Sequence, residues 1–348
     1  MKKKLTLIGH FSTEKMIYNG QTIKSTILYS ELKSMNLYDI CIIDTHGWKR
    51  KPFKLISECK TACKTGDYII MMPDYNGFRI FSRLLPFFRR KKSNCKLIYF
   101  IVGGWLSEFL RKNKSYIKRL NRFDASVAET NFLKDELEEL CVNNVHVIPN
   151  FKRLDIVKTV SPVAKYPYRF CLFSRIMEEK GVEDAIDCIK NINSRYRNDI
   201  VTLDIFGQIE PKYKEKFTQI MKGVPNYIRY KGVKDFNETV NVLKDYYALL
   251  FPTKYYAECM PGTVIDAFAA GIPVIGYEWK GCRDMITDGV EGWLTKADKK
   301  LLEEKIEYAI NDQEMLTKMK MNCVKKAKEY SPDVNIQKIL KLMTDLDK

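Results

Sequence analysis

The chain has 348 residues, and its 59 Lys and Arg against 43 Asp and Glu give a formal net charge of +16. This length suits two domains with separate cores, and the sequence has no apolar run of about 18 residues, which excludes a bilayer-spanning helix. The ten cysteines show no Cys-x-x-Cys spacing and the three histidines lie far apart in the sequence, so we expect reduced thiols in a cytoplasmic protein and no histidine-based metal site.

The first half of the sequence alternates short apolar runs with amphipathic stretches. The apolar runs suit buried parallel strands, and they lie at residues 5–9, 40–44, 68–73, 97–102, 125–128 and 145–149. Amphipathic stretches at 22–35 and 131–140 are typical of helices. A βαβ series of this kind predicts a doubly wound parallel sheet.

A second series of the same kind follows a segment that contains Ser161-Pro162 and Tyr166-Pro167 and lacks clear periodicity. Its predicted strands lie at residues 170–174, 201–206, 228–230, 248–252 and 273–277, and its predicted helices at 182–192, 212–221, 237–245 and 262–270. After Leu294 the sequence predicts helix nearly to the end.

The two series predict an α/β protein of two domains. We expect an N-terminal domain over residues 1–155, a linker over 156–167, a C-terminal domain over 168–330 and, at 331–348, a helix that packs back on the N-terminal domain. In doubly wound sheets ligands bind at the carboxyl ends of the strands, so we expect a cleft lined by these ends of both domains.

The strongest indication of chemistry lies at residues 258–273. Glu258 ends a predicted strand-to-helix loop, and Pro261 and Gly262 open the predicted helix. The first N–H groups of that helix, near Thr263, would be free to bind an anion such as a diphosphate. Two acids beside an anion would repel it unless they bound hydroxyl groups, so Glu258 and Asp266 are predicted to contact sugar and ribose hydroxyls. Alternatively, these acids only favour a helix start through its dipole.

This segment resembles the Glu-x7-Glu signature of the family 4 retaining glycosyltransferases, also called glycosyl transferases group 1. Glu258 takes the place of the first acid, and Asp266 replaces the second. The sequence at 267–274, Ala-Phe-Ala-Ala-Gly-Ile-Pro-Val, resembles the Ala-x-Ala-x-Gly-x-Pro-Val stretch of the family. Cys259 and Met260 stand where the family usually has Gly and an aromatic residue, which alters the predicted pocket for the donor sugar.

A second element, at residues 173–181, resembles the Gly-Arg-x4-Lys-Gly element of the same family, with Ser174 in place of the first Gly. It supplies Arg175 and Lys180 just after a predicted strand. Cleaving a sugar–diphosphate bond builds negative charge on the leaving group, and two fixed cations at a strand end would stabilise that charge. The alternative is a pair of solvated cations in a loop.

Weaker matches extend the resemblance over residues 19–295. Gly20 and Gln21 lie where the family has a glycine-containing loop over the donor phosphates. Gly207, which follows the predicted strand at 201–206, joins the donor-binding candidates. Short stretches at 147–150 and 289–294 match family turns.

One departure concerns the segment after the fourth predicted strand, where many family members have His. This chain has Gly103, Gly104 and Trp105 there. The backbone of the two glycines could replace the His contact. The Trp105 ring would either stack on a sugar or fasten the start of a helix, and the sequence leaves both open.

The resemblance implies a GT-B fold, in which two Rossmann-like domains face each other across a cleft, with the acceptor on the N-terminal side and the donor on the C-terminal side. It implies sugar transfer with retention of configuration from a nucleotide-diphosphate sugar, with UDP favoured, and no cofactor or metal. The acceptor would be a glycan or lipid-linked oligosaccharide of a bacterial surface polysaccharide. The acidic triplet Asp345-Leu346-Asp347 is predicted to be a solvated tail rather than a metal site.

The densest basic run consists of Arg89, Arg90, Lys91 and Lys92, directly after Phe88. Cations beside exposed aromatic side chains suit docking on the inner, anionic face of a membrane. Alternatively, they complement the dipole at a helix end.

Three other functions remain open at this stage. A sugar-nucleotide epimerase or hydrolase shares the same scaffold, and a non-catalytic protein that binds nucleotide sugars would retain much of the site. The charge alone suggests nucleic-acid binding, but the sequence has no basic helix interleaved with aromatic residues and no zinc spacing, which argues against it.

Overall fold

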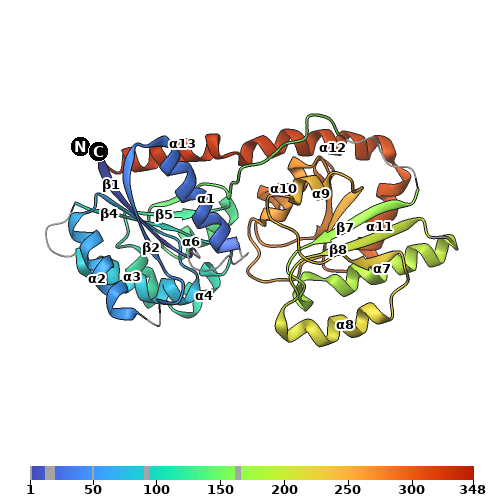
Figure 1. The fold of residues 1–348 in the computed structure, drawn as a ribbon, viewed down its shortest axis with the longest axis horizontal. Helices are drawn as coiled ribbons and strands as arrows, with labels where there is room; N and C mark the ends of the chain where they lie inside the picture. Colours follow the sequence, from blue (N-terminus) through green and yellow to red (C-terminus); the bar gives the residue numbers. More distant parts are fainter. Residues whose placement is uncertain (1, 12–19, 49–50, 90–93, 161–165) are drawn as a thin grey trace. The chain divides into compact units, whose positions relative to one another are not determined.

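The computed structural model describes residues 2–11, 20–48, 51–89, 94–160 and 166–348. The chain forms two compact units. The N-terminal unit comprises Met1–Arg153 together with Pro332–Lys348, and the C-terminal unit comprises Leu154–Ser331. The last helix, drawn in red in Figure 1, therefore belongs with the blue and green first half of the chain.

The N-terminal unit is built on a parallel sheet with strand order β2-β1-β3-β4-β5-β6. Its strands are β1 (Lys3–Gly9), β2 (Tyr38–Asp44), β3 (Tyr68–Met71), β4 (Lys96–Phe100), β5 (Ala125–Ala128) and β6 (Val145–Val147). Its helices are α1 (Gly20–Met35), α2 (Pro52–Thr65), α3 (Tyr75–Arg89), α4 (Leu106–Lys112), α5 (Ser115–Leu120), α6 (Asn131–Glu139) and α13 (Pro332–Asp345). The order reverses between β1 and β3, where such sheets bind ligands.

Helices cover both faces of this sheet, which explains why its central strands are continuous apolar runs. Leu28 and Leu32 of α1 and Ile336 and Ile339 of α13 share one core with the sheet. The α2 and α3 helices pack against each other, as do α1 and α13. The end of α13 is fastened to the sheet, because Asp347 pairs with the Lys3 ammonium at 2.6 Å and accepts a hydrogen bond from Tyr68. Asp345 and Asp347 remain exposed, as predicted for a solvated tail, but Asp347 is anchored rather than loose.

The C-terminal unit has a second parallel sheet, with strand order β12-β11-β10-β7-β8-β9. Its strands are β7 (Tyr168–Phe173), β8 (Val201–Phe206), β9 (Ile228–Tyr230), β10 (Ala248–Phe251), β11 (Val274–Tyr277) and β12 (Gly292–Thr295). Its α-helices are α7 (Val182–Tyr196), α8 (Lys214–Lys222), α9 (Thr239–Leu243), α10 (Gly262–Ala269), α11 (Lys299–Asn311) and α12 (Gln313–Ala327). One core joins the sheet to α7 and α11, and another joins it to α9 and α10.

The sequence analysis missed β12 and assigned its residues to a turn. The reason is Gly292, which looks like a turn residue but pairs with Val274 in the parallel ladder. A Cβ atom at Gly292 would lie 2.0 Å from the Val274 carbonyl oxygen, so the close approach of the two strands requires glycine.

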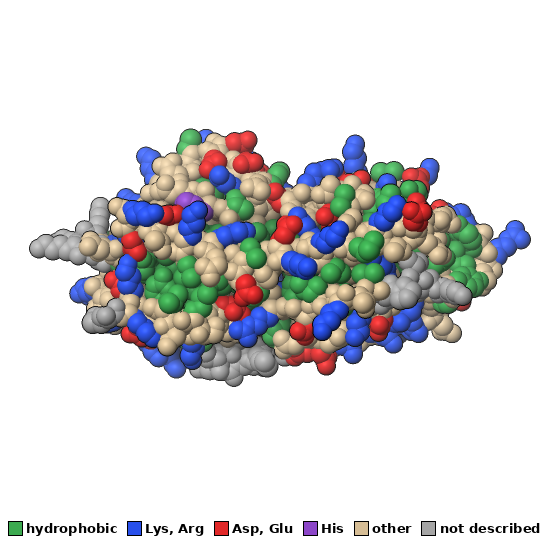
Figure 2. Space-filling model, turned by 90° about the horizontal axis from the view of Figure 1, so that it is seen from above, with side chains coloured by type: hydrophobic (Ala, Val, Ile, Leu, Met, Phe, Trp, Pro, Cys, Tyr) green, Lys and Arg blue, Asp and Glu red, His purple; other side chains and the backbone are tan. Residues whose placement is uncertain are grey.

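The surface charge is dispersed over the face seen in Figure 2, where Lys and Arg side chains lie among Asp and Glu side chains. A nucleic-acid-binding protein would gather its cations in a patch or stripe. Within the described ranges, no helix has the length and apolar character needed to cross a bilayer.

Candidate active site

The candidate site of the C-terminal unit lies where its strand order reverses, at the carboxyl ends of β7 and β10. The loop after β7 carries Arg175 and Lys180, and the loop after β10 carries Glu258. Gly181 brings the two loops together: its φ is +71°, and a Cβ atom there would lie 2.0 Å from the Pro252 carbonyl oxygen. The start of α7 therefore rests directly on the end of β10, in a backbone conformation that glycine readily adopts.

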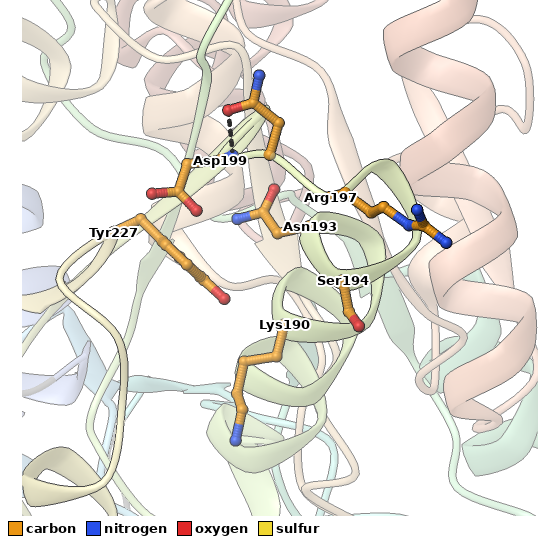
Figure 3. Close-up of a pocket in the computed structure, with 7 residues that line it drawn as sticks. Lys190, Asn193, Ser194, Arg197, Asp199 and Tyr227 are labelled. Carbon is orange, nitrogen blue, oxygen red and sulfur yellow. Dashed lines mark hydrogen bonds between the residues drawn. The ribbon is translucent and has the colours of Figure 1, made fainter.

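A polar cavity of about 390 Å³ lies at the other edge of this sheet (Figure 3). Its lining comes from the end of α7 and from the segments before β8 and β9: Lys190, Asn193, Ser194, Arg197, Asn198, Asp199 and Tyr227. The Asn193 amide exchanges two hydrogen bonds with the backbone of Val201, at 2.9 and 3.0 Å. Because Asn193 is occupied in fastening α7 to β8 and this edge holds the amino ends of the strands, we do not place the active site here.

Lys180 and Glu258 form a buried ion pair, which brings two separately predicted residues into contact. Each residue is 9% exposed, and the Lys180 ammonium is bonded to Glu258 Oε2. Thr253 donates a second hydrogen bond to the same oxygen, at 3.2 Å. The ammonium also lies 5.0 Å from the centroid of the Tyr255 ring. Removing either partner would leave an uncompensated charge in the interior.

Arg175 extends toward solvent beside this pair, and its side chain is 52% exposed. Its guanidinium lies 3.7 Å from a Glu210 carboxylate oxygen, a loose surface contact. Burial raises the pKa of Tyr255, and the nearby Arg175 guanidinium opposes that shift. Tyr255 therefore interacts with both predicted cations.

The start of α10 is the third part of the site. Pro261 is its N-cap residue, and no side chain in the described part of the protein caps it. The Thr263 hydroxyl is buried and has no hydrogen-bond partner among the described residues. A Cβ atom placed on Gly262 would meet no described atom within 4 Å, so there is room in front of the helix. An open, uncapped helix start can bind an anion through its free N–H groups and its dipole.

Three predicted donor contacts are packed inside the unit instead. The exposed fractions of Cys259, Met260 and Asp266 are 3%, 6% and 4%. The Cys259 carbonyl accepts a hydrogen bond from the Trp279 indole at 2.8 Å. Asp266 is enclosed because α10 packs between the sheet and α12. These three side chains are therefore buried in the described structure, and their contacts with the donor stay a prediction.

Gly207 has a structural reason to be glycine. Its φ is +134°, and a Cβ atom would lie 1.7 Å from the Ser174 carbonyl oxygen. The chain leaving β8 thus crosses the end of β7 at close range, which keeps the loop that carries Arg175 in place.

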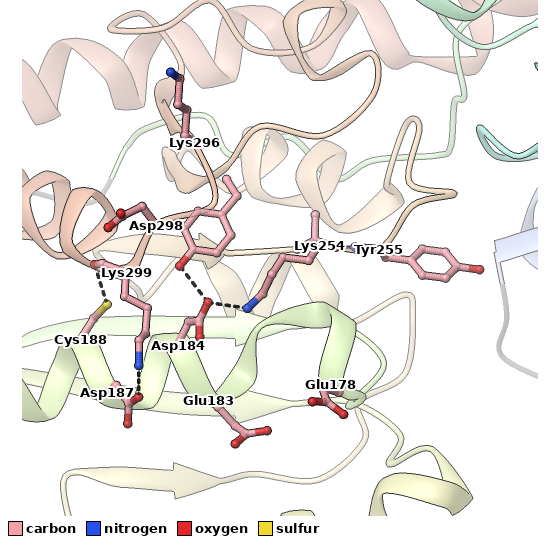
Figure 4. A network of polar contacts seen from close by, with 12 residues as sticks. Glu178, Glu183, Asp184, Asp187, Cys188, Lys254, Tyr255, Lys296, Asp298 and Lys299 are labelled. Atoms are coloured by element: carbon pink, nitrogen blue, oxygen red, sulfur yellow. Dashed lines mark hydrogen bonds and ion pairs between the residues drawn. The ribbon is translucent and has the colours of Figure 1, made fainter. Parts of the chain in front are cut away.

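A network that the sequence analysis missed fastens the Glu258 loop to α7 (Figure 4). Asp184, in the first turn of α7, accepts hydrogen bonds from the Lys254 ammonium and the Tyr277 hydroxyl, both at 2.8 Å. The backbone N–H of Lys254 donates to the Glu179 carbonyl at 2.6 Å. Burial raises the pKa of Tyr277, so its hydroxyl stays protonated and keeps donating to Asp184. Residues on α7, the β10 loop and β11 are too far apart in sequence to reveal this contact.

In the N-terminal unit, the candidates Gly20 and Gln21 lie at the start of α1, and Asn19 lies outside the described residues. The Gln21 amide donates to the Met72 carbonyl at 3.0 Å, which joins α1 to the end of β3. Lys24, one turn further along, forms a buried ion pair with Glu129 at 2.7 Å. This second buried pair was also missed.

Two histidines meet at the same edge of the N-terminal sheet. His46 Nδ1 lies 2.9 Å from His10 Nε2, although the residues are 36 positions apart. His10 Nδ1 in turn lies 2.6 Å from the Thr22 hydroxyl. Burial lowers the pKa of His10, and His46 adds to the shift. The distance between the two histidines in the sequence therefore did not predict their contact in the structure. Among the described residues, no group of three or more His, Cys, Asp or Glu is arranged to hold a metal.

Trp105, in the segment after β4, packs inside the N-terminal unit. Its ring is 8% exposed and lies edge-on to Tyr75 and Phe109. Its indole N–H donates to the Val102 carbonyl at 2.9 Å. These contacts agree with the alternative in which Trp105 fastens the start of α4, and stacking of its ring on a sugar stays a prediction. Gly103 has a φ of +79°, and Gly104 is buried beside it.

Comparison with known proteins identifies a family. The sequence model described as "Glycosyl transferases group 1" matches residues 155–330. The capsular polysaccharide biosynthesis glycosyltransferase CapM of Staphylococcus aureus is 31% identical over 147 residues, which cover 40% of this chain and 36% of that protein. A Campylobacter jejuni N-acetylgalactosaminyltransferase, named for a diphospho-undecaprenol-linked acceptor, is 26% identical over 33% of this chain and 30% of its own length. The aligned segments thus span only about a third of the length of each of these relatives.

Solved structures resemble the chain over nearly its full length. HepE of Anabaena, solved with UDP and glucose, has a TM-score of 0.77 at 15% identity and is matched over 99% of this chain and 100% of its own. Sucrose-phosphate synthase of Thermosynechococcus elongatus has a TM-score of 0.78 at 14% identity, over 99% of both chains. At such identities the likeness concerns the fold. It confirms the predicted GT-B class, with two doubly wound parallel-sheet domains.

The Asp184 network should stabilise the C-terminal unit. Asp184→Asn removes the charge that Lys254 faces, and we expect it to lower the free energy of unfolding by about 1.5–3 kcal/mol, the range for a hydrogen bond to a charged group. Asp187→Asn is a matched control on the same helix, because Asp187 pairs with Lys299 at the same 2.8 Å but on the surface. It should cost less than about 1 kcal/mol. Urea denaturation followed by circular dichroism measures both, and equal losses would contradict the assignment.

Gly207 and Gly262 should respond differently to alanine. Gly207→Ala meets both a disfavoured φ and the Ser174 carbonyl, so we expect a loss of at least about 1–3 kcal/mol in the free energy of unfolding. Gly262→Ala places its methyl group in open space at a helix start and should change the same quantity by less than about 0.5 kcal/mol. Thermal unfolding of the two variants checks this, and a stable Gly207→Ala protein would show that the β8 end can move.

Proposed function

The chain belongs to the glycosyl transferases group 1 family, and on that premise we propose that it transfers a sugar from a nucleotide-diphosphate donor, with UDP favoured, to a glycan or lipid-linked acceptor. We further propose that the transfer retains the anomeric configuration and needs no metal. The arrangement of Arg175, the Lys180–Glu258 pair and the open start of α10 around one sheet edge carries this proposal.

The donor diphosphate fits the start of α10. The free N–H groups of Gly262 and Thr263 would bind its oxygens, with the Thr263 hydroxyl as a further donor. Lys180 is held by Glu258 and can bridge the carboxylate to a phosphate, whereas Glu258 keeps acceptor capacity for a sugar hydroxyl. Arg175 has a long contact with Glu210 and interacts with Tyr255, and its half-exposed guanidinium would turn toward the diphosphate. The ribose contact of Asp266 remains a prediction.

The chemistry then follows from where the charge develops. The bond between the sugar and the diphosphate breaks, and the negative charge that grows on the leaving oxygen is stabilised by Lys180, Arg175 and the α10 dipole without reorganisation. The acceptor hydroxyl oxygen bonds to the same face of the sugar carbon, and its proton passes to the departing phosphate oxygen. This front-face route needs no protein nucleophile.

The relatives support the donor and acceptor classes. Similar structures were solved with UDP, and similar sequences are named for capsule, amylovoran and diphospho-undecaprenol-linked glycan synthesis. We therefore favour a UDP-sugar donor and an acceptor in the synthesis of a surface polysaccharide, which is often built on a lipid at the membrane.

One observation favours a second candidate. The His10–His46 pair supplies the acid–base groups that a sugar-nucleotide epimerase requires. Incubation of UDP-sugars with and without acceptor sugars, followed by product analysis, separates the two, because an epimerase converts the donor sugar without any acceptor.

The cations should be needed for turnover. A panel of UDP-sugars identifies one whose hydrolysis or transfer the protein catalyses. With that donor, we expect Arg175→Ala and Lys180→Ala to lower turnover by about 10²–10³. Lys216→Ala is the control, since Lys216 pairs with Glu183 on the surface. Lys180→Ala also leaves Glu258 without its counter-charge, so its melting temperature is measured in parallel. Near-normal turnover in both folded variants would remove these residues from the site.

The reaction should not depend on a divalent metal, because Lys180, Arg175 and the α10 dipole would take over charge stabilisation. We expect the turnover measured with the same donor to survive an excess of EDTA. A complete loss that Mg²⁺ or Mn²⁺ restores would show that the diphosphate is bound through a metal instead.

A further inference from the structure

Of the basic run at 89–92, the structure describes only Arg89. The Arg89 guanidinium forms an ion pair with Asp124 and donates a hydrogen bond to the Arg122 carbonyl. Arg90, Lys91 and Lys92 lie outside the described residues. The Arg89 side chain thus fastens the end of α3 to the N-terminal unit, and the membrane contact through residues 89–92 stays a prediction.

The outward face of α2 presents a different surface. Phe53 is 85% exposed, more than any other large hydrophobic side chain in the described part of the chain, and Ile56 is 40% exposed. The opposite face of α2 is held in the core by Leu55, Cys59, Ala62 and Cys63. Lys60 and Lys64, both exposed, continue the outward stripe one and two turns beyond Ile56.

The α3 helix packs alongside α2 and extends this surface. Its exposed residues Arg79, Arg83 and Phe87 recur every four positions, so they share one face. Phe87 is 59% exposed, and Phe78, Phe81 and Leu85 hold the other face in the core. Because both helices return from the carboxyl to the amino ends of the strands, Phe53 and Phe87 lie at opposite ends of the pair.

The charge of this helix pair is one-sided. Glu58 is the single acid in the sequences of α2 and α3, and it is paired with Lys54 at 3.7 Å. This contrasts with the mixed charges over the face in Figure 2. Lysines are depleted from the centres of protein interfaces, where apolar residues gather in one patch. Separate aromatic side chains among Lys and Arg fit the headgroup layer of an anionic bilayer better.

We propose that the outward faces of α2 and α3 dock the protein on a bilayer rich in anionic phospholipid. Phe53 and Phe87 insert at the headgroup level, and Lys60, Lys64 and Arg83 bind lipid phosphates. The Phe53 end of the pair is also the carboxyl edge of the N-terminal sheet, where Gln21 joins α1 to β3. This inference rests on the proposed function in one respect only, that a lipid-linked acceptor gives the docking its purpose.

The test compares two triple variants of the full chain in co-sedimentation with vesicles. Phe53→Ser, Lys60→Ser, Lys64→Ser alters the proposed surface. The control, Val334→Ser, Lys338→Ser, Lys341→Ser, removes an exposed apolar residue and two lysines from α13, which packs with α1 in the same unit. The vesicles contain either phosphatidylcholine alone or a third phosphatidylglycerol.

We expect the wild type and the control to bind the phosphatidylglycerol vesicles within twofold of each other, and the α2 variant to bind at least tenfold more weakly. Phosphatidylcholine vesicles should bind none of them appreciably, and salt should weaken binding as the Debye length shortens. Equal binding of both triple variants, or no binding of the wild type at low salt, would overturn the proposal and point to an acidic protein as the occupant.

A readout in solution separates this inference from the proposed function. Hydrolysis of a UDP-sugar without vesicles should be unchanged in the α2 variant, because Arg175, Lys180 and Glu258 belong to the C-terminal unit and the variant leaves Gly20 and Gln21 of α1 unaltered. If no UDP-sugar is a substrate but the vesicle result is as expected, the proposed function fails and the docking surface stands.

Discussion

The buried ion pair between Lys180 and Glu258 joins two loops that leave the C-terminal sheet on either side of its reversal of strand order. Charged groups of this kind are costly to bury, and here the cost is offset by direct contact between the partners and a hydrogen bond from Thr253. The contact is possible only because Gly181 lets α7 rest on Pro252. The close backbone contact at Gly181 therefore helps to bring Lys180 and Glu258 together.

The surrounding contacts make this edge rigid before any ligand arrives. Asp184 holds Lys254 and Tyr277, and the close crossing at Gly207 fixes the chain beside Ser174. By contrast, the N-cap residue of α10 is Pro261, and among the described residues no side chain caps the start of this helix. Rigid charges beside open N–H groups are the arrangement that stabilises a developing anion with the least reorganisation. The loops that carry the charged side chains are thus held by several contacts, whereas the N–H groups at the start of α10 are left for the proposed ligand.

The alternating apolar runs were enough to predict both parallel sheets, because strands covered on two faces have little choice of residue. Local motifs likewise singled out Arg175, Lys180 and Glu258, which the structure places in the loops after β7 and β10, and their roles in catalysis stay predictions. What the sequence could not show were contacts between distant segments, such as Lys24 with Glu129, His10 with His46, and Asp184 with Tyr277. It also could not show burial: Trp105 and Asp266 have suitable chemistry for ligands and are buried in the structure, and their ligand contacts stay predictions.

The two helical layers of the N-terminal unit differ in how much apolar surface they bury. On one layer, α1 and α13 share a core with the sheet, and Asp347 ties the chain end to Lys3. On α2 and α3, aromatic side chains and cations are left exposed with a single acid among them. Exposure of the Phe53 side chain to water is unfavourable. It therefore adds nothing to the stability of the domain. An exposed aromatic on a helix with a well-formed core face is therefore better explained by a surface that the domain meets than by the folding of the domain itself.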